Sequence, residues 1–340
     1  MSKKDTIILG IESSCDDTSA AVLINNRIVS NIIANQAIHE EYGGVVPELA
    51  SRAHQQHIIP VVDAALKKSG IQATDLDAIA FTRGPGLMGS LIVGTSFAKS
   101  FALALDRPLV EVNHMQGHIL AHFIEDEHQS PPNFPFLCLT VSGGHTQLVV
   151  VNDYLDMEVV GTTRDDAAGE AFDKIAKLLG LPYPGGPLVD RYAQEGNPSA
   201  FSFTKPSLPD FEFSFSGLKT NVLQFLTKQT KHNPNFLAEN INDICASLQA
   251  TILDILFEKL IKAARHFNIR EIAIAGGVSA NSGLRKRLQA EGKQRNWNVY
   301  IPKFEYCTDN AAMIAIAGKY NLLAGNIADQ TVAPSARLKF

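Results

Sequence analysis

Cysteine is scarce in this chain, which has four in 340 residues and no Cys-x-x-Cys pair. They stand at 15, 138, 245 and 307, so a disulfide framework and a cysteine-based zinc site are both disfavoured, as suits a reducing compartment. Cys15 and Cys307 are predicted to be small packing residues rather than nucleophiles.

Long apolar segments are also lacking. No apolar run reaches the roughly 18 residues that a membrane span needs. The opening Met-Ser-Lys-Lys-Asp has no apolar signal core behind it. With 45% hydrophobic residues the chain can bury a large core, and its length predicts about two domains. We expect a soluble, cytoplasmic protein.

An excess of positive charge is missing too, because the net charge is −5 and the pI about 6.1. A protein that binds nucleic acid over its whole surface is normally basic. The chain therefore either does not bind nucleic acid, or does so through a local patch or with a partner's help. Its densest basic stretch, 285–295, lies on a predicted helix, for which a solvated face is the default interpretation.

Two segments share a strand–turn–strand plan. Residues 6–11 read as a buried strand followed by a polar turn and the apolar segment 20–24, and 136–151 repeats this plan with a glycine turn. Such a repeat about 130 residues apart indicates a duplicated α/β architecture. The loose Ser-Pro-Pro-Asn-Phe-Pro at 130–135 marks a boundary. We predict one lobe from 1–133 and 308–340, with the C-terminal helix returning to it, and a second lobe from 134–307.

Hydrophobic periodicity predicts the other elements. Strands are expected at 27–34, 76–83, 109–113, 271–275 and 297–302. Helices are expected at 47–68, 91–105, 167–179, 217–228, 241–267 and 309–323, with another opening at the histidine pair described next and one carrying the basic stretch.

His114 and His118 are spaced so that, on a helix, both imidazoles lie on one face and could hold one metal ion. Metalloproteases use this spacing with a glutamate general base directly after the first histidine. That position is Met115 here, which cannot accept a proton. The pair indicates a metal without the usual hydrolytic reaction, although ordinary surface or core histidines share this spacing. Asp309, before the last helix, is either a helix N-cap or a third ligand.

Three glycine-containing turns, at 142–144, 184–186 and 276–277, follow predicted strands. Together with Asp17 and Thr18 they suggest a cradle for phosphate and nucleoside, since glycine lets backbone N–H groups approach an anion. The alternative is that they are only tight turns. Asp173, inside a predicted helix, could bind ligand hydroxyls. No Walker A or Gly-x-Gly-x-x-Gly sequence occurs, which disfavours P-loop and Rossmann folds.

Taken together, these motifs resemble the universal family of transferases that form threonylcarbamoyladenosine in tRNA (TsaD), in its bacterial branch. The similar segments run in order over nearly the whole chain and are 10–18, 43–52, 84–87, 114–118, 141–147, 165–174, 213–219, 275–281 and 307–310.

The resemblance implies a two-lobed actin/hexokinase/Hsp70-like fold with a ligand cleft between the lobes. It implies transfer of a threonylcarbamoyl group from threonylcarbamoyl-AMP to N6 of the adenine 3′ to the anticodon, at tRNA position 37, in tRNAs reading ANN codons. One divalent metal, Fe²⁺ or Zn²⁺, would be held by His114, His118 and Asp309. The adenylate would be held by Thr140, Val141, Ser142, Gly143, Gly144, Asp173, Gly186, Asp190 and Asn281.

The resemblance also implies that the protein acts together with a TsaB-like paralogue and a TsaE-like ATPase. Our hypothesis is that the paralogue binds the predicted helices 47–68 and 91–105. This chain departs from many relatives, which have His-His-Met-Glu-Gly-His, because Asn113 and Gln116 stand here. Neither is an inferred ligand, but the groups that orient the metal ligands can differ. Arg83 stands where small residues are common.

Threonylcarbamoyl-AMP is an activated mixed anhydride, so no covalent enzyme intermediate is needed. The adenine amine is a poor nucleophile, which calls for positioning, a Lewis acid and charge stabilisation. Glu12 is our candidate for handling the amine proton, and satisfying the adjacent turn is its alternative role. A kinase of the same fold superfamily, a metalloendopeptidase and a non-catalytic scaffold are the competing functions.

Overall fold

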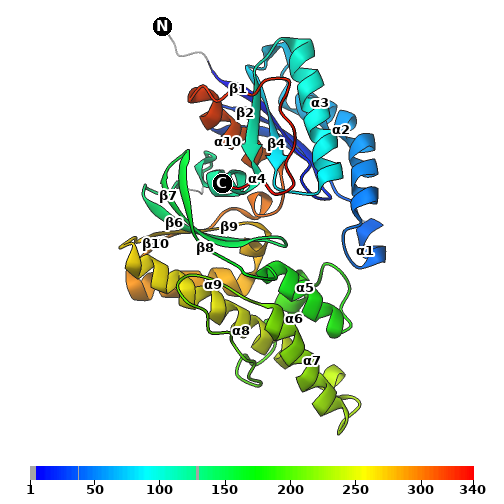
Figure 1. Cartoon of the computed structure of the whole chain (residues 1–340), viewed down its shortest axis with the longest axis vertical. Helices are drawn as coiled ribbons and strands as arrows, with labels where there is room; N and C mark the ends of the chain where they lie inside the picture. The colour runs from blue at the N-terminus through cyan, green and yellow to red at the C-terminus, as the bar shows by residue number, and fades with distance from the viewer. Residues whose placement is uncertain (1–4, 37, 128–129) are drawn as a thin grey trace. The chain divides into compact units, whose positions relative to one another are not determined.

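The computed structural model describes residues 5–36, 38–127 and 130–340 (Figure 1). The chain divides into two compact units. The first contains Met1–Pro132, Asp153–Met157 and Pro302–Phe340, and the second contains Asn133–Asn152 and Glu158–Ile301. Relative to the boundaries predicted from sequence, the short segments 153–157 and 302–307 belong to the first unit and Asn133 belongs to the second.

The first unit is built on a five-stranded sheet in the order β3-β2-β1-β4-β5. β1 pairs antiparallel with β2 and parallel with β4, and β4 pairs parallel with β5. Its strands are β1 (Ile7–Glu12), β2 (Thr18–Ile24), β3 (Arg27–Ala34), β4 (Ala78–Gly84) and β5 (Leu109–Asn113). Its helices are α1 (Ile38–Tyr42), α2 (Pro47–Ser69), α3 (Met88–Leu105), α4 (His114–Leu120) and α10 (Ala311–Leu323), with short 3₁₀ turns at Ala73–Asp75, Ala121–Phe123 and Phe304–Tyr306.

Alternation along β1 explains how helices cover both faces of this sheet. Leu9 and Ile11 are buried in the core that α2 and α3 share with the sheet. Gly10 points the other way, toward α10, where an added Cβ would lie 2.4 Å from the Ala311 carbonyl oxygen. The missing side chain therefore lets α10 pack directly on the strand, and this contact places the start of α10 beside the end of β1.

The second unit repeats the plan with a sheet in the order β10-β9-β6-β7-β8. β6 pairs antiparallel with β7 and parallel with β9, and β9 pairs parallel with β10. The strands are β6 (Phe136–Val141), β7 (Thr146–Asp153), β8 (Asp156–Thr162), β9 (Glu271–Ala275) and β10 (Asn298–Tyr300). The helices are α5 (Ala168–Leu178), α6 (Gly185–Ala193), α7 (Ser216–Thr230), α8 (Phe236–His266) and α9 (Ser282–Arg295), with a 3₁₀ turn at Gly277–Ala280.

Both units thus contain an antiparallel hairpin whose first strand is extended by parallel strands, as the duplicated motif predicted. The long helix α8 begins five residues before its predicted start, because the backbone leaves helical geometry at Asn240 (φ −125°) and the uninterrupted helix follows that kink. The turn at 184–186 is a correction: it follows helix α5, not a strand, and opens α6. The sequence pattern does not predict α6, because glycine and proline fill its first turn.

Among the described residues one helix, α3, has the length and composition of a membrane span, with 18 residues and mean hydropathy 1.4. It contains no long uninterrupted apolar run, because serine, threonine, glycine and one lysine interrupt the apolar residues without making the helix polar on average. Core helices of soluble proteins pass the same test. In this unit α3 packs on α2 and β4.

Candidate functional site

The histidine pair lies where α4 begins, directly after β5. Asn113 is the N-cap of this helix, since its side-chain oxygen accepts hydrogen bonds from the Met115 and Gln116 amides at 2.9 and 3.4 Å. Both imidazoles therefore lie in the first turn and a half of one helix, with ring centres 4.7 Å apart. Met115 points into the core and is only 2% exposed, so it supplies no polar group to the site.

Asp309 joins the two histidines from the other end of the unit's sequence. Its Oδ1 lies 3.4 Å from His114 Nε2 and 3.2 Å from His118 Nε2. The ligand atoms of the three residues all lie within 4.8 Å of one another. Asp309 is not the N-cap of α10, because Asn310 has that role and accepts from the Met313 amide at 3.1 Å. Its carboxylate is therefore not committed to the helix.

Glu12 completes this cluster from the end of β1 and is fully buried. Its Oε2 lies 3.1 Å from His114 Nδ1 and accepts from the Thr82 hydroxyl at 2.6 Å, while its Oε1 accepts from the Ser14 amide. A carboxylate can only accept a hydrogen bond, so Nδ1 of His114 carries the proton and donates the bond to Glu12. Nε2 of the same ring then faces Asp309. Ser14 Oγ also lies 3.1 Å from the same Nδ1.

The pKa values in this cluster are set by burial and by the neighbouring charges. Burial by itself lowers the pKa of His114, but the Asp309 and Glu12 carboxylates outweigh it and raise that pKa to about 10. Burial raises the pKa of Asp309, yet the two histidines hold it well below its ordinary value. The site thus attracts a cation, whether protons on imidazole or a metal ion.

This donor set fits a divalent metal. Two imidazole nitrogens and one carboxylate oxygen converge, and such sets leave open coordination positions that suit iron or zinc. The contact from Glu12 to the far nitrogen of His114 is the kind that fixes the tautomer and orientation of a metal-binding histidine. The neighbours Ser14 and Thr82, which hold Glu12, were not predicted; Ser14 lies inside the conspicuous 10–18 motif, while nothing in the sequence singles out Thr82.

In the second unit, the 142–144 turn joins β6 to β7. The Ser142 amide donates to the His145 carbonyl at 2.8 Å, and the Ser142 hydroxyl accepts from the His145 amide at 3.0 Å. Gly143 and Gly144 are exposed, with open space where their side chains would be. Thr140 and Val141, the residues before them, are buried in the sheet.

Two other glycines bring further backbone against this turn. Gly169, in the first turn of α5, donates its amide to the Ser142 carbonyl at 3.2 Å, and an added Cβ there would lie 2.6 Å from that oxygen. Gly276, after β9, would place a Cβ 2.5 Å from the Val141 carbonyl oxygen. Exposed glycine amides beside a helix N-terminus form an arrangement suited to an anion such as phosphate.

The remaining predicted residues form a second group in this unit. Asp173 Oδ1 accepts from the Gly185 and Gly186 amides at 2.8 and 3.0 Å, so it caps the start of α6. Burial raises the pKa of Asp173, and these two bonds only partly counter it. Among the described residues its second oxygen has no hydrogen-bond partner.

Asp190 and Asn281 meet at the start of α9. The Asp190 carboxylate accepts from the Ser282 amide and hydroxyl, each at 2.9 Å. Asn281 is the N-cap of α9, accepting from the Leu284 amide at 2.9 Å and donating to Gln249 Oε1 at 2.7 Å. Both side chains thus have structural partners, and Ser282 and Gln249 were not predicted from sequence.

Comparisons with known proteins point in one direction. The family model described as "TsaD: tRNA N6-adenosine threonylcarbamoyltransferase" matches residues 27–316. A protein of that name from Riemerella anatipestifer is 60% identical over 334 residues, covering 98% of each chain. Another, from Christiangramia forsetii, is 61% identical over 340 residues and covers both chains completely.

Solved structures with the same fold are much more distant in sequence. Full-length HypF in its phosphate- and nucleotide-bound form matches 94% of this chain with 47% of its own, at TM-score 0.62 and 14% identity. Component A of the (R)-2-hydroxyglutaryl-CoA dehydratase of Acidaminococcus fermentans covers 94% of this chain and 99% of its own, at TM-score 0.53 and 14% identity. These likenesses concern the fold alone, and they confirm the predicted actin/hexokinase-like α/β class.

Proposed function

This chain belongs to the TsaD family of tRNA N6-adenosine threonylcarbamoyltransferases, and from that premise we propose how its residues carry out the transfer. The protein is a transferase that forms threonylcarbamoyladenosine in tRNA. The donor we propose is threonylcarbamoyl-AMP, and the acceptor is N6 of adenine 37. The observation that carries this proposal is the convergence of His114, His118 and Asp309 in a member of this family.

His114, His118 and Asp309 would hold one divalent metal ion, Fe²⁺ or Zn²⁺. When bound, such an ion supplies Lewis acidity to an anhydride or phosphate oxygen. The protein's own contribution is orientation. α4 presents both imidazoles from one turn, and Asp309 approaches them before the first residue of α10. The third coordinating side chain therefore comes from a segment almost 200 residues away in sequence.

We propose that Glu12 orients His114. Its contact with Nδ1 keeps a proton on that nitrogen, so Nε2 is the nitrogen that would bind the ion in place of its own proton. All of its described contacts, from Ser14, Thr82 and His114, hold the carboxylate in place. Its satisfaction of the turn at Ser14 is part of the same arrangement. A role of Glu12 in moving the amine proton stays a prediction.

The adenylate would be held by the second unit. Gly143 and Gly144 offer exposed backbone amides for the phosphate, and the N-terminus of α5 adds partial positive charge beside them. The free oxygen of Asp173 can accept from ribose hydroxyls. Asp190 and Asn281 keep acceptor capacity beyond their capping bonds, because each carboxylate or amide oxygen has two lone pairs. Thr140, Val141, Ser142 and Gly186 shape the backbone around these groups.

The transfer breaks the bond between the threonylcarbamoyl carbon and the phosphate oxygen and forms one to adenine N6, releasing AMP and a proton. No covalent protein intermediate is required, so positioning and charge stabilisation carry the catalysis. The absence of a general base after His114 and the burial of Met115 do not favour a metalloendopeptidase. A small-molecule kinase would have no use for the His114, His118 and Asp309 set.

We further propose a cytoplasmic complex with a TsaB-like paralogue and a TsaE-like ATPase. The α2–α3 pair is our candidate surface for the paralogue, because large apolar side chains are exposed on it. Ile59 is 64% exposed, Met88 45% and Ile92 48%. Exposed apolar groups gathered on neighbouring helices mark association surfaces. Replacing Ile59 and Ile92 by Asp should abolish co-purification with the paralogue while leaving the melting temperature unchanged.

One assay tests the proposed donor. Purified protein, both partners, synthetic threonylcarbamoyl-AMP and unmodified tRNA are combined, and the digested nucleosides are analysed by mass spectrometry. Threonylcarbamoyladenosine at position 37 is the expected product. A metal-loaded, folded protein that gives none with this donor would overturn the assignment of threonylcarbamoyl-AMP.

A further inference from the structure

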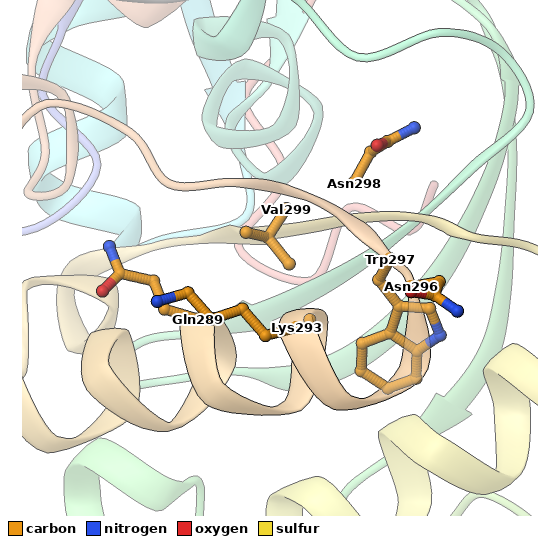
Figure 2. Close-up of a pocket in the computed structure, with 7 residues that line it drawn as sticks. Gln289, Lys293, Asn296, Trp297, Asn298 and Val299 are labelled. Carbon is orange, nitrogen blue, oxygen red and sulfur yellow. The ribbon is translucent and has the colours of Figure 1, made fainter.

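The end of the basic stretch, with Lys293, lines a surface pocket that the proposed reaction does not use. The pocket, of about 650 Å³, lies between the last two turns of α9 and the start of β10. Figure 2 shows Gln289 and Lys293 projecting from the helix, with Trp297 beside the helix end. Its lining residues are Gln289, Gly292, Lys293, Asn296, Trp297, Asn298 and Val299.

The indole of Trp297 is held in a defined position. α9 ends at Arg295, and its C-cap Asn296 has a left-handed backbone (φ 55°) that redirects the chain. The Trp297 amide then donates to the Gly292 carbonyl at 3.0 Å. Gly292 is required here, because a Cβ would lie 2.7 Å from a methyl of Val299. The Arg295 guanidinium stands 5.8 Å from the indole centre. Trp297 packs partly against the hydrophobic core of the second unit, and the rest of the ring stays accessible.

Some of the basic side chains on this surface form ion pairs, and others do not. Arg287 and Arg295 pair with Glu291, and Arg287 also binds Asp254 at 2.6 Å. Lys286 and Lys293 are exposed, and within the described part of the chain neither has a carboxylate at ion-pair distance. Lys286, Gln289 and Lys293 are three and four residues apart, so they form one row on the helix leading into the pocket.

We infer that this row and Trp297 form an accessory binding surface for the tRNA, separate from the metal and adenylate residues. The two available lysines lie about 10 Å apart along the helix and suit separate phosphates of one strand. The exposed part of the Trp297 indole suits stacking with an unpaired base. The Gln289 and Asn296 amides can hydrogen-bond base edges. The aromatic ring favours RNA over an acidic peptide. Such a local patch lets a chain of net charge −5 contact a polyanion.

This inference depends on tRNA as the substrate but not on the proposed donor or metal. Its test therefore measures binding rather than turnover. Trp297 is the only tryptophan in the chain, so its emission reports directly on this pocket. Titrating the full-length protein with unmodified tRNA should quench that emission with the same midpoint as binding followed by fluorescence anisotropy of labelled tRNA.

The second measurement is tRNA binding after the charges of Lys286 and Lys293 have been reversed. Lys286→Glu with Lys293→Glu should weaken tRNA binding about 10-fold and lower the slope of log K against log salt by about 2. The matched control is Lys228→Glu with Lys231→Glu, which makes the same charge change at exposed positions on and just after α7. Trp297→Leu should weaken binding about 10-fold, and Trp297→Phe should restore most of it.

Three results would overturn the inference: unchanged emission at saturating tRNA, equal weakening by the control pair, or unaltered binding by the α9 pair. Circular dichroism of each variant confirms that it is folded. Loss of modification activity without loss of binding would concern the proposed reaction and would leave this surface in place.

Discussion

Asn113 and Lys339 are joined by a hydrogen bond from the asparagine Nδ2 to the lysine carbonyl oxygen, at 3.0 Å. The Oδ1 of the same asparagine caps α4, which carries both histidines. One side chain therefore connects the end of the chain to the proposed metal ligands. The tail that brings Lys339 there is held by further bonds, among them Arg83 Nε to the Ala333 carbonyl at 3.1 Å and the Ser335 amide to the Arg83 carbonyl at 2.9 Å. Arg83 thus has a structural role in this chain.

Asn113→Ala should weaken metal binding about 10-fold, because it removes the cap and the tail contact that orient α4. It should also lower the free energy of unfolding by about 1 kcal/mol through loss of the cap. Metal affinity is measured by competition with a chelator, and stability by denaturant unfolding of the metal-free protein. Asn113→Asp keeps the capping oxygen but loses the donor to Lys339, so it separates the two contributions. Equal metal affinity in all three proteins would show that neither contact orients the ligands.

Asp309→Asn should reduce bound metal to a small fraction of the wild-type content, because a neutral amide binds divalent ions far more weakly than a carboxylate. Elemental analysis of the purified protein gives the metal content, and nucleoside mass spectrometry gives the activity; both should fall together. His232→Ala, at an exposed histidine, is the matched control and should leave both unchanged. A variant at Asp309 that keeps its full metal content would remove this residue from the ligand set.

Asp165 provides a pH-dependent contribution to stability. Burial raises its pKa, but hydrogen bonds from Ser214, Phe215 and Ser216 outweigh that effect and lower the pKa below its ordinary 3.8. The contribution is therefore fully present above pH 3.8 and is lost as the pH falls through the lowered value. Asp165→Asn should cost about 1 kcal/mol at pH 7, after allowance for solvent exposure.

Thermal melts of Asp165→Asn and wild type, from pH 7 to below pH 3.8, measure the contribution of this carboxylate to stability. The difference between them should shrink as the pH falls below 3.8. Asp156→Asn removes the same charge at an exposed position and should melt like wild type throughout. A constant difference at all pH values would mean that the charge of Asp165 contributes nothing.

Gly169→Ala should displace the 142–144 turn, because its Cβ would meet the Ser142 carbonyl carbon at 2.8 Å and the Gly143 Cα at 2.9 Å. AMP binding, measured by calorimetry, should weaken at least 10-fold if this turn holds the phosphate. Gly217→Ala is the control, since open space surrounds that position at the start of α7. Unchanged AMP affinity in Gly169→Ala would place the phosphate elsewhere.

Most strands and helices followed from the sequence because hydrophobic periodicity is strong in this chain. β3 and β5 have the predicted bounds, and α2 differs by one residue at its end. Two of the elements that were not predicted have local reasons. α6 opens with two glycines and a proline, and β8 alternates buried and exposed residues only weakly. Local propensity is a poor guide where packing in the unit determines the conformation.

The sequence alone does not decide whether Asp309 is the N-cap of α10. Asp309 and Asn310 are both good N-cap residues, and only the fold shows that Asn310 takes this role. The contact between Glu12 and Thr82 was hidden for a similar reason. Their contact joins β1 to β4 across 70 residues, and nothing local to either one indicates it.

The amino-acid sequence by itself determined the family, the duplicated α/β plan and the presence of a histidine pair without a hydrolytic base, because those depend on residue types and their spacing. Only the tertiary structure decided which groups share a proton or an ion. Convergence of Glu12, His114, His118 and Asp309 requires that the ends of β1 and β5 and the start of α10 meet in space. That meeting results from strand pairing and from close packing of α10 on Gly10, interactions between segments far apart in the chain.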